Sequence, residues 1–319
     1  LQEGFATYYA LLAERELFGE DHFQHELYDM AERLQQASKT DTIPVLNEKA
    51  STLSFYQKGA WALHVLRENV GSEAFRKAVK SYIEKYAYKT ATTDDFIAEV
   101  NKVSTYDTTG WKKRWLESPG FEVAEALSLL GKNEFMQLYL KVGELADKRF
   151  HEKKPIFMQI LQSDQFYPVK EEVIFQMAEV PWEDKKELII YAMQTGDVKL
   201  RQAVARTLSK IPSGFEEQYI TLLNDKSYVT REIALNLLCS RLPARKSEFL
   251  DKSASWVGFN DKNLRILWLA LTVSAEGYRP SEKENYYSEL QSYAMPGYES
   301  SIRENAMANL IYLGRPDPV

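Results

Sequence analysis

The sequence predicts an all-α protein, and three observations support this prediction. Only 14 of the 319 residues are glycine, apolar residues recur with helical spacing along most of the chain, and no stretch alternates strictly between apolar and polar residues. Hydrophobic residues make up 45% of the chain and charged residues 27%, as in ordinary globular proteins. A chain of this length can bury more than one core, so we expect two domains.

The first three helices are marked by the residues at their ends. Helical patterns run over about 3–18 and 22–38, and Asp21 stands where a capping side chain would begin the second. A third pattern begins near residue 55 and runs to Gly71, because a glycine suits the position that follows a helix.

The next signals indicate a further helix and a domain boundary. Thr93 is followed by Asp94 and Asp95, which predicts a helix with a capping hydroxyl and acids in its first turn. The stretch "ESPGF" at 117–121 contains Pro119 and Gly120, and we place the boundary there. The predicted domains are therefore residues 1–118 and 119–319.

A degenerate repeat follows the boundary. Aligned on arginine, it reads "DVKLRQAVARTL", "SYVTREIALNLL", "DKNLRILWLALT" and "ESSIRENAMANL", with spacings of 30, 34 and 38 residues between Arg201, Arg231, Arg265 and Arg303. A repeat of this length built from helix pairs predicts an α-solenoid that resembles HEAT-type repeats. We expect the arginines to pair with nearby acids or loop carbonyls and so hold the repeats together.

Composition excludes several classes of function. The net charge is −6 with acids and bases interspersed, whereas a nucleic-acid binder would show a basic field. The sequence contains no run of 18 apolar residues, so it predicts no membrane span. The single Cys239 excludes an internal disulfide and a cysteine-based zinc site, and it leaves the cytoplasm, the periplasm and secretion all open as compartments.

Two segments carry a resemblance to a known family. "LQEGFATYYALLAE" at the N-terminus and the stretch from "FYQKGAWALHVL" to "WLESPGF" resemble consecutive helices of the gluzincin aminopeptidases, of the aminopeptidase N and leukotriene hydrolase type. The E-G-F-A and Y-x-K-G elements occur in the family's order, and the resemblance covers residues 1 to about 121. No β-sandwich pattern separates this part from the later helices, as in the leukotriene hydrolase branch.

The resemblance implies a chemistry for two residues. A catalytic zinc takes three protein ligands and keeps one position open, and H-E-x-x-H supplies two histidines and a general base. By resemblance, Glu3 is the third zinc ligand, and Tyr56 is a phenol that stabilises the tetrahedral intermediate. The implied reaction is removal of N-terminal residues from peptide substrates.

Most of that zinc site is missing from the sequence. None of the four histidines belongs to an H-E-x-x-H motif, and the family's G-x-M-E-N segment is also absent. His22 and His25 share a helical face but follow Glu3 instead of preceding it, so we expect a solvated first turn. We expect His64 to be packed in a core. "HEKKP", after His151, has the wrong spacing for a zinc helix.

We therefore interpret the chain as the second half of a gluzincin catalytic domain followed by a HEAT-like domain. Leu1 opens within a helical pattern, which suggests a cut end. We expect the chain alone to be inactive and without stoichiometric zinc. An exposed face near residues 5–12 suggests a homodimer. The alternative interpretation is a non-catalytic helical scaffold that binds a protein or peptide.

Overall fold

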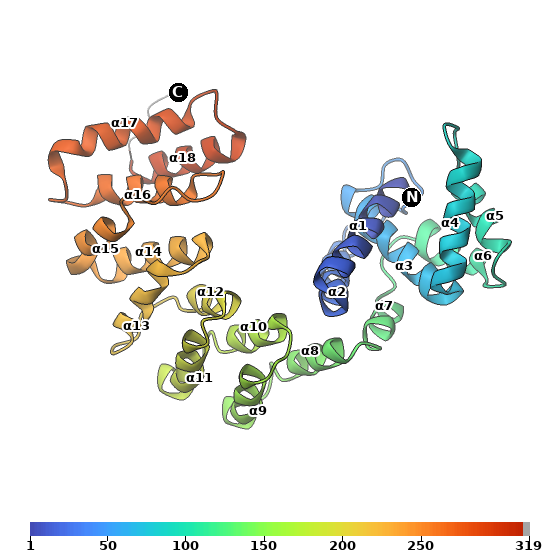
Figure 1. Ribbon diagram of the computed structural model, residues 1–319, viewed down its shortest axis with the longest axis horizontal. Helices are drawn as coiled ribbons and strands as arrows, with labels where there is room; N and C mark the ends of the chain where they lie inside the picture. The colour runs from blue at the N-terminus through green and yellow to red at the C-terminus, as the bar shows by residue number, and fades with distance from the viewer. Residues whose placement is uncertain (315–319) are drawn as a thin grey trace. The chain divides into compact units, whose positions relative to one another are not determined.

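The computed structural model describes residues 1–314, and within them every regular element is helical (Figure 1). This confirms the all-α prediction. The chain forms two compact units, Leu1–Lys141 and Val142 onward. The domain boundary expected at 117–121 stays a prediction. No helix among the described residues is long and apolar enough to cross a membrane.

The first unit is built around α3, Gly59–Val70, whose residues from Gly59 to Leu66 are all buried. The helices around it are α1 (Gln2–Phe18), α2 (Glu20–Ala37), α4 (Ser72–Tyr86), α5 (Thr93–Asn101), α6 (Thr108–Trp111) and α7 (Val123–Leu130). Two π-helical turns, Ser54–Lys58 and Lys112–Glu117, precede α3 and follow α6. Helix α8, Glu134–Glu144, crosses the division between the units.

Tryptophans fix the core of the first unit through hydrogen bonds to neighbouring elements. The Trp61 indole donates to the Leu27 carbonyl at 3.1 Å, and the Trp111 indole donates to the Ala62 carbonyl at 2.9 Å. Both side chains are fully buried, so each ring contributes a large apolar area while its one polar atom is satisfied. The core therefore has a defined arrangement around the helix that follows Tyr56.

Two helix starts differ from the sequence prediction. Helix α5 is capped by Thr92, which accepts from the Asp95 amide while the Asp95 carboxylate accepts from the Thr92 amide, so the capping hydroxyl is not that of Thr93. Helix α2 begins at Glu20 without a side-chain cap. Asp21 lies in its first turn and accepts a hydrogen bond from Asn133 at 3.0 Å, a tertiary contact that replaces the expected cap.

The second unit is a stack of helix pairs. Its helices are α9 (Phe150–Gln162), α10 (Tyr167–Phe175), α11 (Trp182–Gln194), α12 (Val198–Thr207), α13 (Glu216–Ile220), α14 (Tyr228–Arg241), α15 (Lys246–Ser253), α16 (Asn263–Ser274), α17 (Lys283–Ala294) and α18 (Ser300–Tyr312). The helices α10, α12, α14, α16 and α18 contact one another in that order, and the others pack beside them. This is the arrangement of an α-solenoid.

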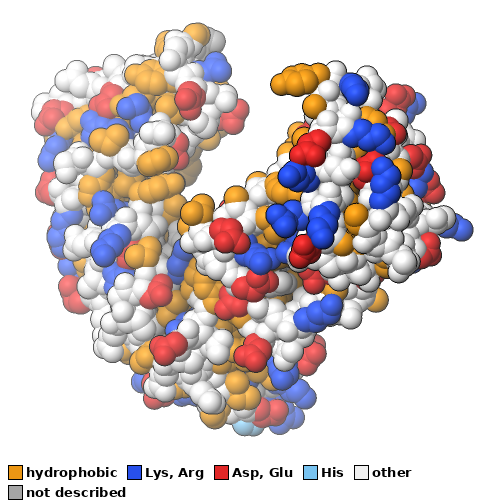
Figure 2. All heavy atoms as spheres, turned by 45° about the vertical axis from the view of Figure 1, so that its right-hand side comes forward, with side chains coloured by type: hydrophobic (Ala, Val, Ile, Leu, Met, Phe, Trp, Pro, Cys, Tyr) orange, Lys and Arg blue, Asp and Glu red, His pale blue; other side chains and the backbone are white. Residues whose placement is uncertain are grey.

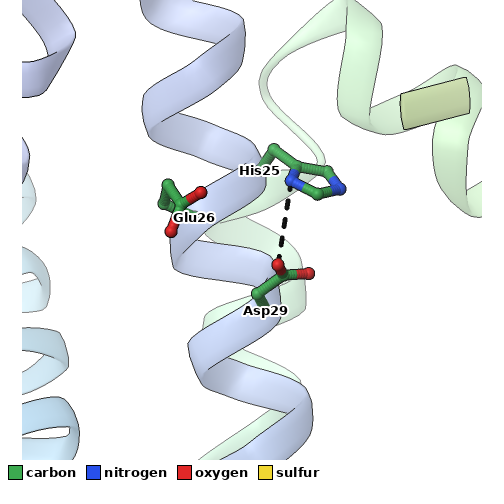
Figure 3. Close-up of side chains that lie close together, drawn as sticks. All are labelled: His25, Glu26 and Asp29. Carbon is green, nitrogen blue, oxygen red and sulfur yellow. Dashed lines mark ion pairs between the residues drawn. The ribbon is translucent and has the colours of Figure 1, made fainter. Parts of the chain in front are cut away.

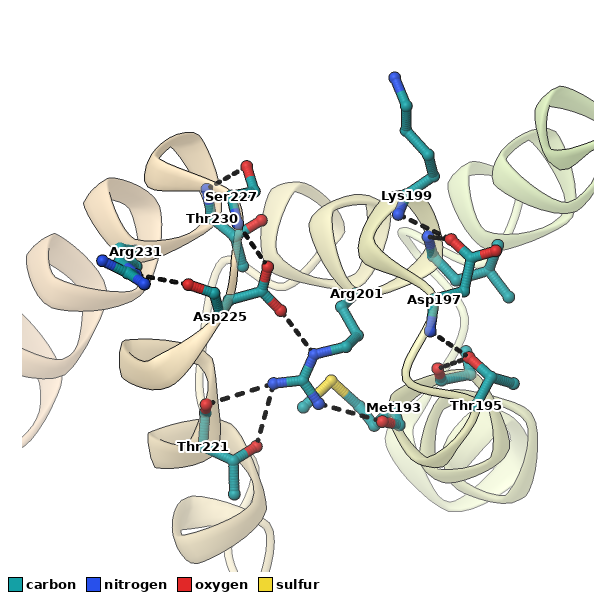
Figure 4. A network of polar contacts seen from close by, with 12 residues as sticks. Met193, Thr195, Asp197, Lys199, Arg201, Thr221, Asp225, Ser227, Thr230 and Arg231 are labelled. Carbon is teal, nitrogen blue, oxygen red and sulfur yellow. Dashed lines mark hydrogen bonds and ion pairs between the residues drawn. The ribbon is translucent and has the colours of Figure 1, made fainter. Parts of the chain in front are cut away.

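Three of the four repeated arginines make the contacts that the sequence predicts. Arg201 donates to the Asp225 carboxylate at 2.6 Å, to the Met193 carbonyl at 3.1 Å and to the Thr221 carbonyl at 3.2 Å (Figure 4). Arg265 pairs with Glu289 in a bidentate contact.

The other two arginines differ from each other. Arg231 donates to the Asp225 carbonyl and lies over the Trp256 ring, so it also holds neighbouring segments together. The Arg303 Nε is buried without a hydrogen-bond partner.

Two lysines link the two helices of a pair by hydrogen bonds to carbonyls at a helix end. The Lys185 ammonium donates to the carbonyls of Met177 and Ala178, just beyond the end of α10, at 2.7 and 2.9 Å. Lys283 donates to the carbonyls of Val273 and Ala275 at the end of α16. The Lys185 side chain is buried and that of Lys283 is half-buried, and each supplies a donor to carbonyls at or just beyond the end of a helix.

Candidate functional site

Glu3 and Tyr56 come together because two helices cross at a pair of glycines. Helix α1 and α3 meet where Gly4 faces Gly59, and a Cβ at position 4 would lie 2.6 Å from the carbonyl carbon of Gly59. A Cβ at position 59 would in turn lie 3.0 Å from the Gly4 Cα. The backbones can approach this closely only without side chains at either position. Each glycine belongs to one of the two sequence elements, E-G-F-A and Y-x-K-G.

The crossing places the Tyr56 phenol beside the Glu3 carboxylate. A hydrogen bond to Glu3, together with the charge of that carboxylate, raises the pKa of Tyr56 above its ordinary value. The contact places the phenol and the carboxylate of the two family elements next to each other. The Tyr56 side chain is 41% exposed, so it is also within reach of a ligand from solvent.

Tyr56 lies on the π-helical turn Ser54–Lys58 rather than on a regular α-helix. Such turns are rare and are frequent at functional sites, because the extra residue per turn re-aims a side chain. The sequence predicts a helix beginning near residue 55 and gives no sign of this irregularity.

Lys58 anchors the same turn from the opposite side. Its ammonium is buried and donates to the Ser118 carbonyl at 2.7 Å, and burial lowers the pKa of Lys58. Asp41 holds the preceding residues, because its carboxylate accepts from the Ser51 hydroxyl at 2.5 Å and from the Ser54 hydroxyl at 3.1 Å. In Y-x-K-G the tyrosine thus faces out, the lysine faces in and the glycine makes the helix crossing.

The histidines lie apart from this pair. His22 contacts Glu14 at 3.3 Å. Glu14 lies on α1 eleven residues after Glu3, which is roughly 16 Å along the helix. His25 contacts Asp29 at 3.9 Å and packs against the Tyr139 ring. Neither is therefore a partner of Glu3.

One group of side chains among the described residues is close enough to share a metal ion, namely His25, Glu26 and Asp29 (Figure 3). Glu26 follows His25 by one position and so leaves the helix about 100° around from it. Glu3 does not belong to this group. The described residues thus offer one carboxylate beside Tyr56 and do not complete a zinc site by themselves, since a catalytic zinc takes three protein ligands.

Comparison with known proteins identifies the segment that carries this pair. Residues 1–115 match the family described as the peptidase family M1 domain. The N-terminal segment is therefore similar to the M1 peptidases. This agrees with the aminopeptidase resemblance of the sequence, and the M1 family is zinc-dependent.

The curated relatives are aminopeptidases of much greater length. Aminopeptidase M1-D of Oryza sativa subsp. japonica is 33% identical over 132 residues, which are 39% of this chain and 15% of the relative. Aminopeptidase N of Lactococcus lactis subsp. lactis is 31% identical over 118 residues, or 35% and 13% of the two chains. Aminopeptidase M1 of Arabidopsis thaliana is 30% identical over 146 residues, or 43% and 17%. The match therefore spans less than a fifth of each relative. No solved structure matches the chain.

His64 of the M1 segment is buried in the core, as the sequence predicts. Its Nδ1 lies 3.2 Å from the Tyr8 hydroxyl, and the rings of Phe23 and Trp61 surround it. Burial, with a contribution from the charge of Arg67, lowers the pKa of His64 to about 3. The imidazole is therefore neutral in the folded protein, and it serves packing instead of metal binding.

This burial predicts an acid sensitivity of the fold. The unfolded chain binds a proton on His64 below its ordinary pKa of 6.5 while the folded chain does not, so stability is lost as the pH falls from 6.5 towards 3. One proton corresponds to a slope of about 1.4 kcal/mol per pH unit. His64→Gln keeps an acceptor for Tyr8 and should remove this slope from urea unfolding measured across that pH window. His151→Gln, at an exposed position, should leave the slope unchanged.

Proposed function

We propose that the chain is part of a zinc-dependent aminopeptidase that removes N-terminal residues from peptides. Glu3 is the zinc-binding carboxylate that this chain contributes, and Tyr56 is the donor that stabilises charge on the carbonyl oxygen of the substrate. The observation that carries the proposal is the Gly4–Gly59 crossing, because it brings the key residues of both family elements side by side. We assign residues 1–118 to the catalytic domain and 119–319 to the HEAT-like domain.

The state of Tyr56 suits the proposed role. A tyrosine phenol is protonated at neutral pH, and a protonated phenol can donate a hydrogen bond to an oxygen that gains negative charge. The buried Lys58 and the tight crossing fix the backbone on which the phenol stands. Fixed donors of this kind are worth about 10²–10³ in turnover.

The first experiment measures zinc content by elemental analysis, together with turnover of an aminoacyl chromogenic substrate, on the purified chain of residues 1–319. We expect neither stoichiometric zinc nor turnover, because one carboxylate cannot hold a catalytic zinc. Stoichiometric zinc with turnover would contradict this ligand assignment.

Substitutions in the complete gene product distinguish the role of Glu3 from that of Tyr56. Glu3→Gln should lose both zinc and turnover, whereas Tyr56→Phe should keep zinc and lose turnover by roughly 10²–10³. Tyr88→Phe, at a fully exposed tyrosine, is the matched control and should change neither. Zinc retained in Glu3→Gln, or full turnover in Tyr56→Phe, would disprove the corresponding role.

The second candidate function is a helical scaffold, and the solenoid of the second unit is the observation that favours it. Stacked helix pairs present extended surfaces that bind proteins or peptides. A complete gene product that holds no zinc and has no turnover, yet binds a peptide through residues of the second unit, would favour this candidate.

A further inference from the structure

Charged side chains of this protein normally lie at the surface, and Lys58 is an exception. Over the visible face of Figure 2, lysines and arginines are interspersed with acids. The Lys58 side chain is only 3% exposed, and the other buried lysines among the described residues are Lys153 and Lys185. Burying an ammonium costs free energy that an apolar side chain of the same size does not cost. A lysine at this position therefore points to a conformation that it fixes.

The π-helical turn Ser54–Lys58 is buried at both ends and exposed in the middle. Ser54 is 6% exposed and Lys58 3%, whereas Tyr56 between them is 41% exposed. The two ends thus face the protein interior while the phenol faces outward. The contacts that hold the two ends therefore determine the direction of the Tyr56 side chain.

Asp41 holds the first end of the turn. Its carboxylate accepts from the Ser54 hydroxyl at 3.1 Å and from the Ser51 hydroxyl at 2.5 Å. The Ser51 hydroxyl in turn accepts from the Ser54 amide at 3.1 Å. Asp41 is itself held, because its carboxylate also accepts from the Ile43 amide at 3.3 Å. Ser54 is thus fixed through both its backbone and its side chain.

Lys58 holds the second end of the turn. Its ammonium donates to the Ser118 carbonyl at 2.7 Å. Phe121, three residues after that carbonyl, packs its ring against those of Trp61 and Trp115, with centroids 5.7 and 5.6 Å apart. The acceptor of Lys58 therefore lies beside a well-packed part of the core.

The two ends of the turn meet in one site. Asp41, Ser54 and Lys58 line a single cavity of about 10 Å³, which has room for no more than about one water molecule. Burial lowers the pKa of Lys58, and the charge of Asp41 opposes this by favouring the ammonium. The carboxylate that holds one end of the turn therefore stabilises the charge that holds the other end.

We propose that Asp41 and Lys58 are positioning residues for Tyr56, which hold the two ends of the π-helical turn and so direct the phenol towards Glu3. Both residues act through Tyr56. Their effect on turnover rests on the proposed function of Tyr56, whereas their effect on the orientation of the phenol does not. A group misplaced by about 1 Å can lose about 10²-fold in rate, so a small change in the turn has a large effect.

The first test measures zinc content, kcat and KM in the complete gene product. Lys58→Met should keep zinc and KM and lower kcat by about tenfold to a hundredfold. In a Tyr56→Phe background it should change kcat by less than about twofold, because the phenol that it misdirects is already gone. A merely structural role of Lys58 would lower kcat in both backgrounds. Lys153→Met, at a lysine that is 4% exposed in the second unit, is the matched control and should leave kcat within about twofold.

The second test observes the phenol directly in residues 1–319. A fluorotyrosine placed only at position 56 gives a fluorine resonance that reports the surroundings of the ring. Lys58→Met and Asp41→Ala should move this resonance towards its position in the urea-unfolded chain, and Lys153→Met should leave it in place. Ser54→Ala removes a single hydroxyl from the first end, so it replaces any larger substitution that prevents folding. Circular dichroism checks that each variant is folded.

Three outcomes would overturn the proposal. The fluorine resonance is the same in Lys58→Met as in the wild type, or kcat is unchanged in Lys58→Met although Tyr56→Phe loses turnover. In the third, Lys58→Met loses as much kcat in the Tyr56→Phe background as in the wild type. Full turnover in Tyr56→Phe would instead contradict the proposed function, and the fluorine resonance would still decide whether Lys58 positions the ring.

Discussion

Gly4→Ala is expected to destabilise the first unit by about 1–3 kcal/mol. The new Cβ would lie 2.6 Å from the backbone of Gly59, and a backbone atom cannot turn aside as the end of a side chain can. Helices α1 and α3 would have to separate, which would move Glu3 away from Tyr56. Urea unfolding followed by tryptophan fluorescence measures the loss, because Trp61, Trp111 and Trp115 are buried in this unit.

The control for this prediction is another helical glycine. A Cβ at Gly143, in α8, would meet nothing within 4 Å. Gly143→Ala should therefore leave stability unchanged or raise it by up to about 1 kcal/mol, as helix propensity predicts. Equal effects of the two substitutions would mean that the crossing is looser than the structure shows.

Arg201→Met is expected to cost the second unit about 3–5 kcal/mol. The Asp225 side chain is 2% exposed, and the guanidinium 2.6 Å away is the cation paired with it. Removing that cation leaves a buried carboxylate without its counter-charge. The Met193 and Thr221 carbonyls also lose their donor (Figure 4). Thermal and urea unfolding of the purified chain measure the effect.

Two further variants identify the cause of the stability lost in Arg201→Met. Arg201→Met combined with Asp225→Asn removes the buried charge and should recover most of the loss, since the amide can still accept from the Ser227 N–H. Arg245→Met breaks ion pairs with Glu217 and Glu248, in which all three side chains are at least 35% exposed, and should cost less than about 1 kcal/mol. A double variant as unstable as Arg201→Met would rule out the unpaired carboxylate as the cause.

Local patterns were sufficient to predict the helices and the repeat. Helical periodicity predicted α1 and α3, and Gly71 predicted the end of α3. Gly19 and Gly71, which follow these two helices, both adopt a positive φ, which suits the end of a helix. The four arginines predicted the repeat because each begins an apolar helix, and three of them make the expected contacts.

Local sequence patterns could not predict how the candidate site is assembled. Gly4 and Gly59 are separated by more than fifty residues, and nothing local indicates that they face each other. The π-helical turn at Tyr56 carries Lys58, which reaches Ser118 in another contact between distant residues. Family elements predicted which residues matter, while the reason for their glycines became clear only from the packing.

The lysines and arginines of the second unit bear on how such a chain can change over evolution. Lys185 and Lys283 each donate to carbonyls of their own helix pair. A duplicated pair would therefore keep these hydrogen bonds. Arg201 instead reaches segments on both sides of its pair, so each duplication would leave contacts of this kind to be re-formed at the new junction. Unequal repeat lengths of 30, 34 and 38 residues are compatible with such a history.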